Sequence, residues 1–130
     1  MSESARPTLV FVYGTLKTGG TNHHYLKGQK LLGEARTEPG YRLYVVADYP
    51  GLVADRSDQE GVQGELWAVD AATLPALDEL EGLDEGLYAR EPIQLQAPFD
   101  RHEVVTYYYL FPVAGCPTLP DGNWPVHMGW

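Results

Sequence analysis

Two short stretches of the sequence contain residues that could do chemistry. The first is Tyr13-Gly14-Thr15-Leu16, which follows an apolar run of β-branched and aromatic residues. Glycine lets a ligand approach the main chain closely, so the N–H groups of residues 14–16 could converge on an anion. A Gly-Thr pair also ends many strands that bind nothing. The stretch alone therefore leaves two interpretations open, a ligand loop and an ordinary turn.

The second stretch is a group of acidic residues around Glu81. We predict a helix between residues 70 and 82 with Thr73 as its N-cap, ending at Glu81 because a glycine follows. Leu77 and Glu81 are four residues apart, which places them on one helix face. Burial raises the pKa of a carboxylate and suits it to general acid and base catalysis near neutral pH. Acidic residues in such a group are also typical of a solvated helix face, so the pattern alone does not decide.

The elements that must position these stretches are mostly strands. Glu38-Pro39-Gly40 is a turn signal, and it predicts a hairpin between strands 30–36 and 41–47. Tyr49-Pro50-Gly51 is expected to break the second of these strands. Further strands are predicted over residues 9–13, 61–69, 87–96 and 103–111, and a short helix over residues 21–27.

Three other features of the sequence concern how the elements pack. Residues 104–111 are almost continuously apolar and aromatic, which is typical of a strand with both faces covered. Gly64 inside a predicted strand indicates a bulge or the close approach of another backbone. The tail from residue 112 onward contains four prolines and no periodicity, so we expect ordered coil with Trp124 and Trp130 as anchors.

The composition indicates one domain over residues 1–130, with 44% hydrophobic residues and enough length to bury a core. The net charge of −9 comes from 18 acidic and 9 basic residues, and the basic residues form no cluster, which argues against a nucleic-acid partner. No membrane-spanning stretch and no signal-peptide pattern are present, so we expect no membrane partner and a cytoplasmic location. The single cysteine, Cys116, suits a reducing compartment.

The motifs of several other chemistries are missing from the sequence. The four histidines, at positions 23, 24, 102 and 127, show no metal-ligand spacing, and neither Cys-x-x-Cys nor His-Glu-x-x-His occurs. The phosphate-binding Gly-x-x-x-x-Gly-Lys loop and the Gly-x-Ser-x-Gly nucleophile elbow are also missing. We therefore expect no metal and no other cofactor, and an acyl-enzyme route lacks its nucleophile.

Four motifs, in order along the chain, resemble the γ-glutamylcyclotransferase family. They are Tyr-Gly-Thr-Leu-Lys at residues 13–17, Glu-Gly-Val-Gln-Gly-Glu-Leu-Trp-Ala-Val-Asp at 60–70, Leu-Asp-x-x-Glu-Gly at 77–82 and Leu-Tyr-x-Arg at 87–90. The resemblance implies an α+β fold, a small mixed β-barrel with a few short helices, that binds a γ-glutamyl group in a cavity.

The resemblance also assigns roles to individual residues. It implies that Glu81 is the catalytic acid and base and that Tyr88 lies beside the site. The substrate-binding loop that it implies consists of Tyr13, Gly14, Thr15 and Leu16.

The activity implied by the resemblance is the intramolecular cyclisation of a γ-glutamyl amine or dipeptide to 5-oxoproline, with release of the free amine. This reaction needs no protein nucleophile, because the substrate's own α-amine attacks its γ-carbonyl. Lys17 and Asn22-His23 resemble the γ-glutamylamine branch of the family, while the amine itself and the oligomeric state stay open. Two alternatives are a non-catalytic module that binds γ-glutamyl ligands and a tailoring enzyme that removes a γ-glutamyl protecting group in biosynthesis.

Overall fold

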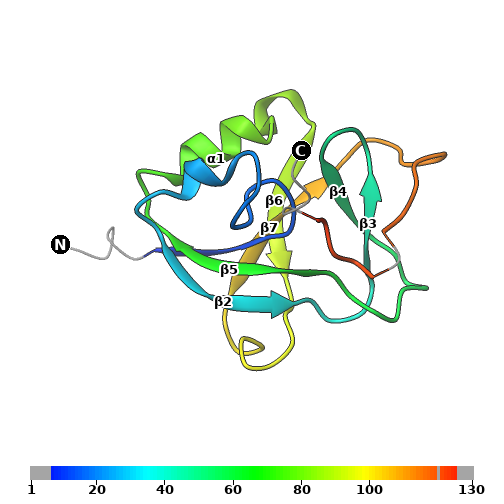
Figure 1. Cartoon of the computed structure of the whole chain (residues 1–130), viewed down its shortest axis with the longest axis horizontal. Helices are drawn as coiled ribbons and strands as arrows, with labels where there is room; N and C mark the ends of the chain where they lie inside the picture. Colours follow the sequence, from blue (N-terminus) through cyan, green and yellow to red (C-terminus); the bar gives the residue numbers. More distant parts are fainter. Residues whose placement is uncertain (1–6, 120, 126–130) are drawn as a thin grey trace.

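Strand β1 (Thr8–Val12) is central to the fold because both of its faces are apolar. The computed structural model describes residues 7–119 and 121–125, and in it β1 pairs with β5 (Gln63–Val69) and with β7 (Val104–Tyr109) (Figure 1). The first pairing is antiparallel and the second is parallel. The remaining strands are β2 (Lys30–Arg36), β3 (Tyr41–Val45), β4 (Pro50–Ala54) and β6 (Tyr88–Ile93).

The seven strands form one mixed sheet in the order β2-β5-β1-β7-β4-β3, and β6 pairs with β7 off this path. Three short helices accompany the sheet, namely η2 (His23–Leu26), α1 (Leu74–Leu80) and η3 (Leu83–Glu85). The predicted α+β fold with a mixed sheet and a few short helices is therefore confirmed.

Alternating side chains of β1 divide the buried residues into two clusters. Phe11 belongs to the first cluster, and its neighbours Val10 and Val12 belong to the second. The second cluster also contains residues of η2 and α1, so the helices cover that face of the sheet. Strand β7 contributes Val104 to the first cluster and Tyr107 to the second, which confirms that both of its faces are covered.

The predicted hairpin between residues 30–36 and 41–47 is wrong, although both strands form. β2 pairs with β5 instead, and β3 pairs with β4. β2 and β3 are therefore the two end strands of the path, and the sheet is not closed into the expected barrel, because closing the path would require these two strands to pair. A single bridge between Thr37 and Leu95 links the segments that follow β2 and β6.

Strand β4 is the second departure from the prediction. The Tyr-Pro-Gly stretch at residues 49–51 does not interrupt the sheet, because Pro50 is the first residue of β4, a position where a strand tolerates proline. Gly51 lies against Tyr109, and an added Cβ at Gly51 would be 2.7 Å from the Tyr109 Cβ. A proline and a glycine that resemble a break thus belong to a strand inside the sheet, between β7 and β3.

Helix α1 begins and ends where the sequence predicts. Thr73 is its N-cap residue and Glu81 its C-cap residue. The capping hydrogen bond comes from Asp70, whose Oδ1 accepts the Thr73 N–H at 2.8 Å, while the Thr73 side chain makes no cap bond. Gly82 follows with φ of +70°, a left-handed conformation that glycine adopts easily, and the chain turns there into η3.

The C-terminal tail packs along β3 and then returns toward the start of the chain. Residues 117–119 hydrogen-bond to β3. The Lys17 ammonium, which is buried, donates to the Asn123 side chain at 2.8 Å and to the Trp124 carbonyl at 2.7 Å. Trp124 packs against the first cluster, as expected for an anchor, whereas Trp130 lies outside the described residues.

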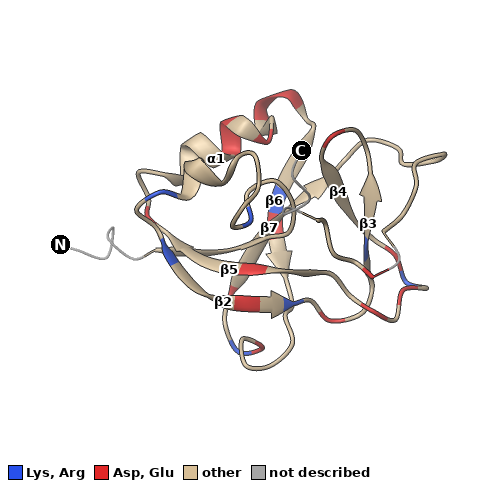
Figure 2. Cartoon of the chain, viewed as in Figure 1, with Lys and Arg blue, Asp and Glu red and all other residues tan. Residues whose placement is uncertain are grey.

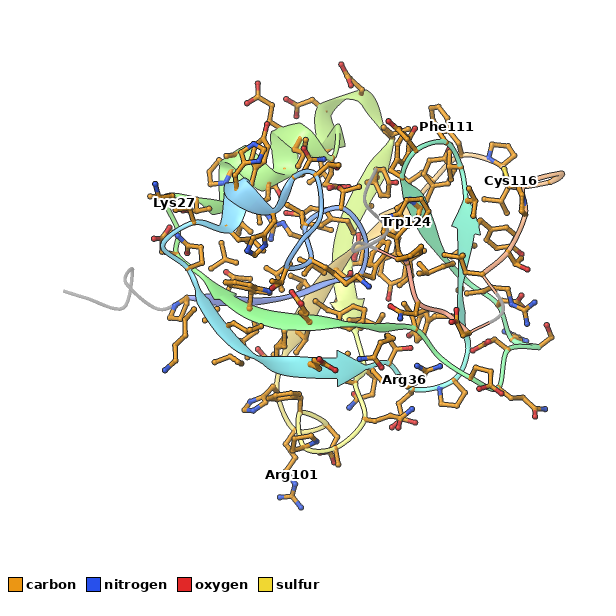
Figure 3. The ribbon with its side chains drawn as sticks, viewed as in Figure 1. Lys27, Arg36, Arg101, Phe111, Cys116 and Trp124 are labelled. Carbon is orange, nitrogen blue, oxygen red and sulfur yellow. The ribbon has the colours of Figure 1, made fainter. Side chains whose placement is uncertain are left out.

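Charged residues are spread over the described part of the chain. Lys and Arg occur singly on several elements, while Asp and Glu are frequent on α1 and the turn that follows it (Figure 2). Cys116 lies on the outer loop of the tail (Figure 3). Within residues 7–119 and 121–125, no helix is long and apolar enough to cross a membrane. The expectation of no nucleic-acid partner stays a prediction.

Candidate active site

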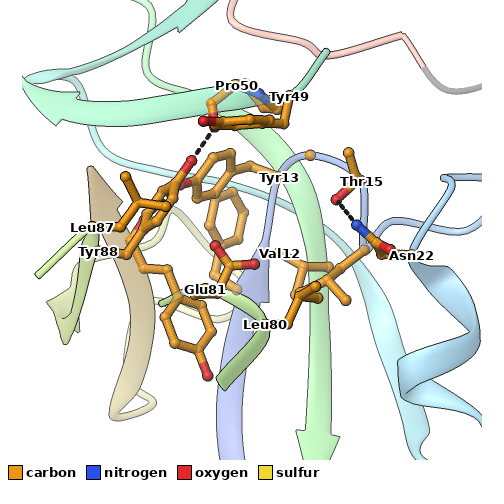
Figure 4. A pocket seen from close by; sticks show the side chains of 14 residues that line it. Val12, Tyr13, Thr15, Asn22, Tyr49, Pro50, Leu80, Glu81, Leu87 and Tyr88 are labelled. Carbon is orange, nitrogen blue, oxygen red and sulfur yellow. Dashed lines mark hydrogen bonds between the residues drawn. The ribbon is translucent and has the colours of Figure 1, made fainter. Parts of the chain in front are cut away.

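The six residues that the sequence singles out line one cavity of about 200 Å³. The cavity lies between the loop after β1, the end of α1 and the first residues of β4 and β6 (Figure 4). The six are Tyr13, Gly14, Thr15, Leu16, Glu81 and Tyr88. The fold thus brings together two stretches that are more than sixty residues apart in the sequence. Their catalytic and binding roles stay predictions.

Glu81 is held at the cavity by the end of helix α1. Its backbone N–H donates to the Leu77 carbonyl at 3.0 Å, and its partly buried carboxylate points into the space beside Tyr13, Tyr88 and Val12 (Figure 4). Burial raises the pKa of Glu81 to about 7, and no second cause acts on it. No Lys or Arg lines this cavity among the described residues. The carboxylate is therefore suited to exchange protons near neutral pH.

The loop after β1 owes its shape to Gly14. This glycine permits a close approach rather than a left-handed conformation, since an added Cβ would lie 2.6 Å from the Cγ atom of Pro50. The Asn22 N–H donates to the Thr15 carbonyl at 2.9 Å, and the Asn22 side-chain amide donates to the Thr15 hydroxyl at 3.0 Å. Within the described residues, no protein group accepts a hydrogen bond from the N–H groups of residues 14–16, so no internal partner competes with a ligand for them.

The tyrosines of the cavity form its walls and are held by hydrogen bonds to the backbone. The Tyr13 hydroxyl donates to the Tyr107 carbonyl, and the Tyr88 hydroxyl donates to the Pro50 carbonyl at 2.8 Å. Burial, and then the charge of Glu81 and neighbouring groups, raises the pKa of both Tyr13 and Tyr88 above the usual tyrosine value. Both side chains are therefore neutral over the physiological range, and Glu81 is the group that titrates.

A half-buried ion pair fixes the last turn of α1 on the sheet. The Arg90 guanidinium donates to both oxygens of Asp78, at 2.9 and 3.0 Å. The Tyr107 hydroxyl donates to Asp78 Oδ1 at 2.8 Å. Such two-point contacts are geometrically specific. Because Asp78 precedes Glu81 by three residues, one helical turn, the pair sets the position of the Glu81 carboxylate.

Several lining residues were missed by the sequence interpretation. Asn22 was considered for its resemblance to the γ-glutamylamine branch, Tyr107 as part of a strand with both faces covered, and Tyr49 and Pro50 as a break. A usable signal existed for the ion pair, because its two charged residues lie within the Leu-Asp-x-x-Glu-Gly and Leu-Tyr-x-Arg motifs. Within residues 7–119 and 121–125, no group of three or more His, Cys, Asp or Glu could hold a metal ion. Independence from metals stays a prediction.

Gly14→Ala is expected to destabilise the protein by about 1–3 kcal/mol, because the new Cβ would overlap the Pro50 ring. Urea unfolding measures the loss. The second variant is Gly14→Ala combined with Pro50→Ala, which removes both ring atoms that the new Cβ would meet. The double variant should recover part of the loss relative to Pro50→Ala alone. Equal unfolding midpoints for Gly14→Ala and the unchanged protein would contradict the close approach.

The sequence belongs to the γ-glutamylcyclotransferase family. A model of the family described as "Gamma-glutamyl cyclotransferase, AIG2-like" matches residues 10–126, which is nearly the whole chain. A γ-glutamylcyclotransferase family protein, ytfP, from Citrobacter rodentium is 38% identical over 115 residues, covering 88% of this chain and 93% of its own. The YtfP protein of Escherichia coli K12 is 36% identical over 115 residues, covering 88% and 94%.

Solved structures of this family share the fold. An AIG2-like protein from Mus musculus superposes with a TM-score of 0.77 at 25% identity, over 88% of this chain and 87% of that one. The solution structure of ytfP from Escherichia coli gives a TM-score of 0.68 at 35% identity, over 90% and 96%. These comparisons support a cyclotransferase-like enzyme, and they show that this chain has the fold of its solved relatives.

Proposed function

We propose that the protein cyclises the γ-glutamyl group of a γ-glutamyl amine or dipeptide to 5-oxoproline and releases the amine. The observation that carries the proposal is the composition of the cavity. A partly buried carboxylate, Glu81, with a pKa raised to about 7, lines the same cavity as the available N–H groups of residues 14–16. Membership of the family supports the same class of reaction.

The reaction forms one C–N bond and breaks another, both at the γ-carbonyl carbon. Glu81 as a carboxylate takes a proton from the substrate's α-ammonium, and the α-nitrogen then attacks the γ-carbonyl and closes a five-membered ring. The bond to the amine breaks as the acid form of Glu81 protonates the leaving nitrogen. The α-nitrogen passes from three hydrogens to one, so two protons reach the amine, which leaves as an ammonium. Glu81 ends in its initial state.

The rest of the cavity supports this step through position and charge. Walls such as Tyr13, Tyr88 and Leu80 hold the glutamyl chain folded. Holding reacting groups in the attacking geometry can remove about 7–11 kcal/mol from the barrier of a well-oriented reaction. The N–H groups of residues 14–16 bind the α-carboxylate or the oxyanion that forms on the γ-carbonyl oxygen. No metal or thiol takes part, and the reaction is cytoplasmic.

A panel of γ-glutamyl amines and γ-glutamyl dipeptides tests the proposal. The protein is incubated with each compound, and 5-oxoproline and the free amine are measured together by mass spectrometry. We expect both products in equal amounts with at least one substrate. Free glutamate in place of 5-oxoproline would mean hydrolysis, and the cyclisation mechanism would be wrong.

The same panel separates the alternatives. A non-catalytic module would bind γ-glutamyl compounds in calorimetry and release nothing, which would overturn the proposal. A tailoring enzyme that removes a protecting group would share the chemistry and differ in the amine, so it would turn over one complex amide and leave the simple amines untouched.

The pH dependence of kcat/KM should report the ionisation of the Glu81 carboxyl group. Because the carboxylate form takes the first proton, kcat/KM is expected to fall by about tenfold per pH unit below about pH 7 and to level off above it. Initial rates at low substrate concentration between about pH 5 and about pH 8 measure this profile. A flat profile over this range would mean that no group with a pKa near 7 is used.

A further inference from the structure

A second hollow, of about 490 Å³, is lined in part by the loop that follows β1. It is formed by the loop itself, by the segment between β3 and β4, and by the C-terminal tail. Neither Glu81 nor the tyrosine walls of the first cavity line it. The roles assigned above leave this hollow unused.

The two hollows are neighbours around the loop that follows β1. Thr15 lines both of them. Asn22 and Tyr49 line the first cavity, and their chain neighbours Thr21 and Asp48 line the second hollow. The second hollow is therefore the neighbouring space for a part of the substrate that passes Thr15. The part of a γ-glutamyl amide that extends beyond the γ-carbonyl is the substituent of the amine.

The lining of the second hollow is mainly apolar and has one charge. Asp48 is its ionisable residue, and no Lys or Arg of the described chain lines it. The nearby Lys17 ammonium is already directed to the Asn123 side chain and the Trp124 carbonyl. The apolar lining residues are Val45, Ala47, Leu119, Trp124 and Pro125. This surface favours an aliphatic or aromatic chain, with or without a terminal ammonium, over a substituent that ends in a carboxylate.

We infer that the hollow formed by residues 45–48, the loop at residues 19–21 and Trp124 is the subsite for the amine substituent. It selects γ-glutamyl amides of apolar or cationic amines over γ-glutamyl amides whose amine carries a carboxylate. This inference rests on the proposed function, because it assigns a second half to the same substrate. In this inference the C-terminal tail contributes to substrate specificity, because Trp124 forms one wall of the subsite.

Four substrates that share the L-γ-glutamyl group test the subsite. The first is the methylamide, which is too short to reach past Thr15. The other three carry a pentyl chain that ends in a methyl group, an ammonium or a carboxylate. For the unchanged protein at low ionic strength, we expect kcat/KM for the ammonium substrate to exceed that for the carboxylate substrate by about fivefold, the scale of one exposed charge contact. The neutral chain should lie between them.

Asp48→Asn should remove the preference between the charged substrates and leave the methylamide unchanged. Asp84→Asn is the matched control, because Asp84 is also exposed but lies on η3, outside both hollows. If Asp48→Asn and Asp84→Asn alter the preference equally, the charge acts at long range and the subsite is wrong.

Trp124→Ala should lower kcat/KM for the neutral pentyl substrate by about tenfold, through lost apolar contact, with little effect on the methylamide. Because this change also loosens the tail, Ala47→Phe is the second variant. Ala47 is exposed and lines the hollow, so a larger side chain fills the subsite without entering the core. We compare the ratio of kcat/KM for the pentyl substrate to kcat/KM for the methylamide. If this ratio is the same in Ala47→Phe as in the unchanged protein, the inference is overturned.

The outcomes separate the two proposals. If no substrate, including the methylamide, yields 5-oxoproline, the proposed function fails. If the methylamide is turned over while the three longer substrates respond to none of the variants, the function holds and the subsite fails. An inverted preference, with the carboxylate substrate favoured, would also overturn the charge argument.

Discussion

Glu81→Gln is expected to lower kcat by about a hundredfold or more, while the protein still folds and still binds γ-glutamyl ligands. Glutamine has the shape of the carboxylic acid form of glutamate but cannot accept a proton from the substrate's α-ammonium. Its partly buried position at the end of α1 is kept by the backbone hydrogen bond to Leu77, which the substitution does not touch. Single-turnover assays with mass-spectrometric detection of 5-oxoproline measure the loss.

Glu79→Gln is the matched control for this variant. Glu79 belongs to the same helical turn, but its side chain is exposed and lines none of the hollows described above. Its replacement should leave kcat within about twofold, because it removes only a solvated charge. Full activity in Glu81→Gln would exclude Glu81 as the acid and base.

Glu81 is also expected to make the stability of the protein depend on pH. Its pKa is 4.5 when unperturbed and about 7 in the folded protein, so between these values the folded state holds a proton that the unfolded state has lost. The stability that Glu81 contributes is present below about pH 4.5 and is lost as the pH rises through about 7. At 1.36 kcal/mol per pKa unit, the loss is on the order of 3 kcal/mol.

The glutamine of the Glu81→Gln variant does not titrate, so the variant should not lose stability in this way as the pH rises. The free energy of unfolding of the variant, relative to the unchanged protein, is therefore expected to rise by roughly 2–3 kcal/mol between about pH 5 and about pH 8. Urea unfolding at several pH values measures it, with Glu79→Gln as the control that follows the unchanged protein. A constant difference across this range would mean that the Glu81 carboxylate is hydrated in the folded state.

Local sequence patterns predicted the features that depend on neighbouring residues. Thr73 and Glu81 mark the ends of helix α1 as expected, because a cap and a following glycine act within a single turn. Gly64 was expected to allow a close approach, and an added Cβ there would be 2.3 Å from the Val12 carbonyl oxygen. Strand β2 was predicted with its bounds, residues 30–36.

The errors concern pairing between distant segments. Residues 38–40 do separate two strands, as predicted. A turn signal does not determine whether the two strands that flank it pair with each other. β2 pairs with β5, which is also seven residues long. β3 pairs with β4, which begins at Pro50 and lies between β3 and β7. Closure of a barrel is a property of the whole strand order, which no local signal carries.

The sequence predicted six of the residues that line the candidate cavity, but it did not predict the hydrogen bonds that hold the cavity walls in place. The motif residues from Tyr13 to Leu16, together with Glu81 and Tyr88, all line the cavity. The sequence does not indicate that Tyr107 accepts a hydrogen bond from Tyr13 through its carbonyl and donates one to Asp78 through its hydroxyl. Such links depend on the parallel pairing of β1 with β7, which follows only from the complete topology.

The contacts that hold the loop after β1 have a consequence for biosynthesis. Residues 13–17 are translated well before the residues that hold them, because the partner of Tyr13 lies 94 positions later and that of Lys17 lies 107 positions later. Contacts so distant carry a high loop-closure entropy and slow folding. On the ribosome, β1 therefore cannot pair with β7, and the loop after β1 cannot contact the tail, until nearly all of the described chain has been made. A nascent chain that stalls before residue 107 exposes an apolar, unpaired strand edge, which is the kind of surface that chaperones protect.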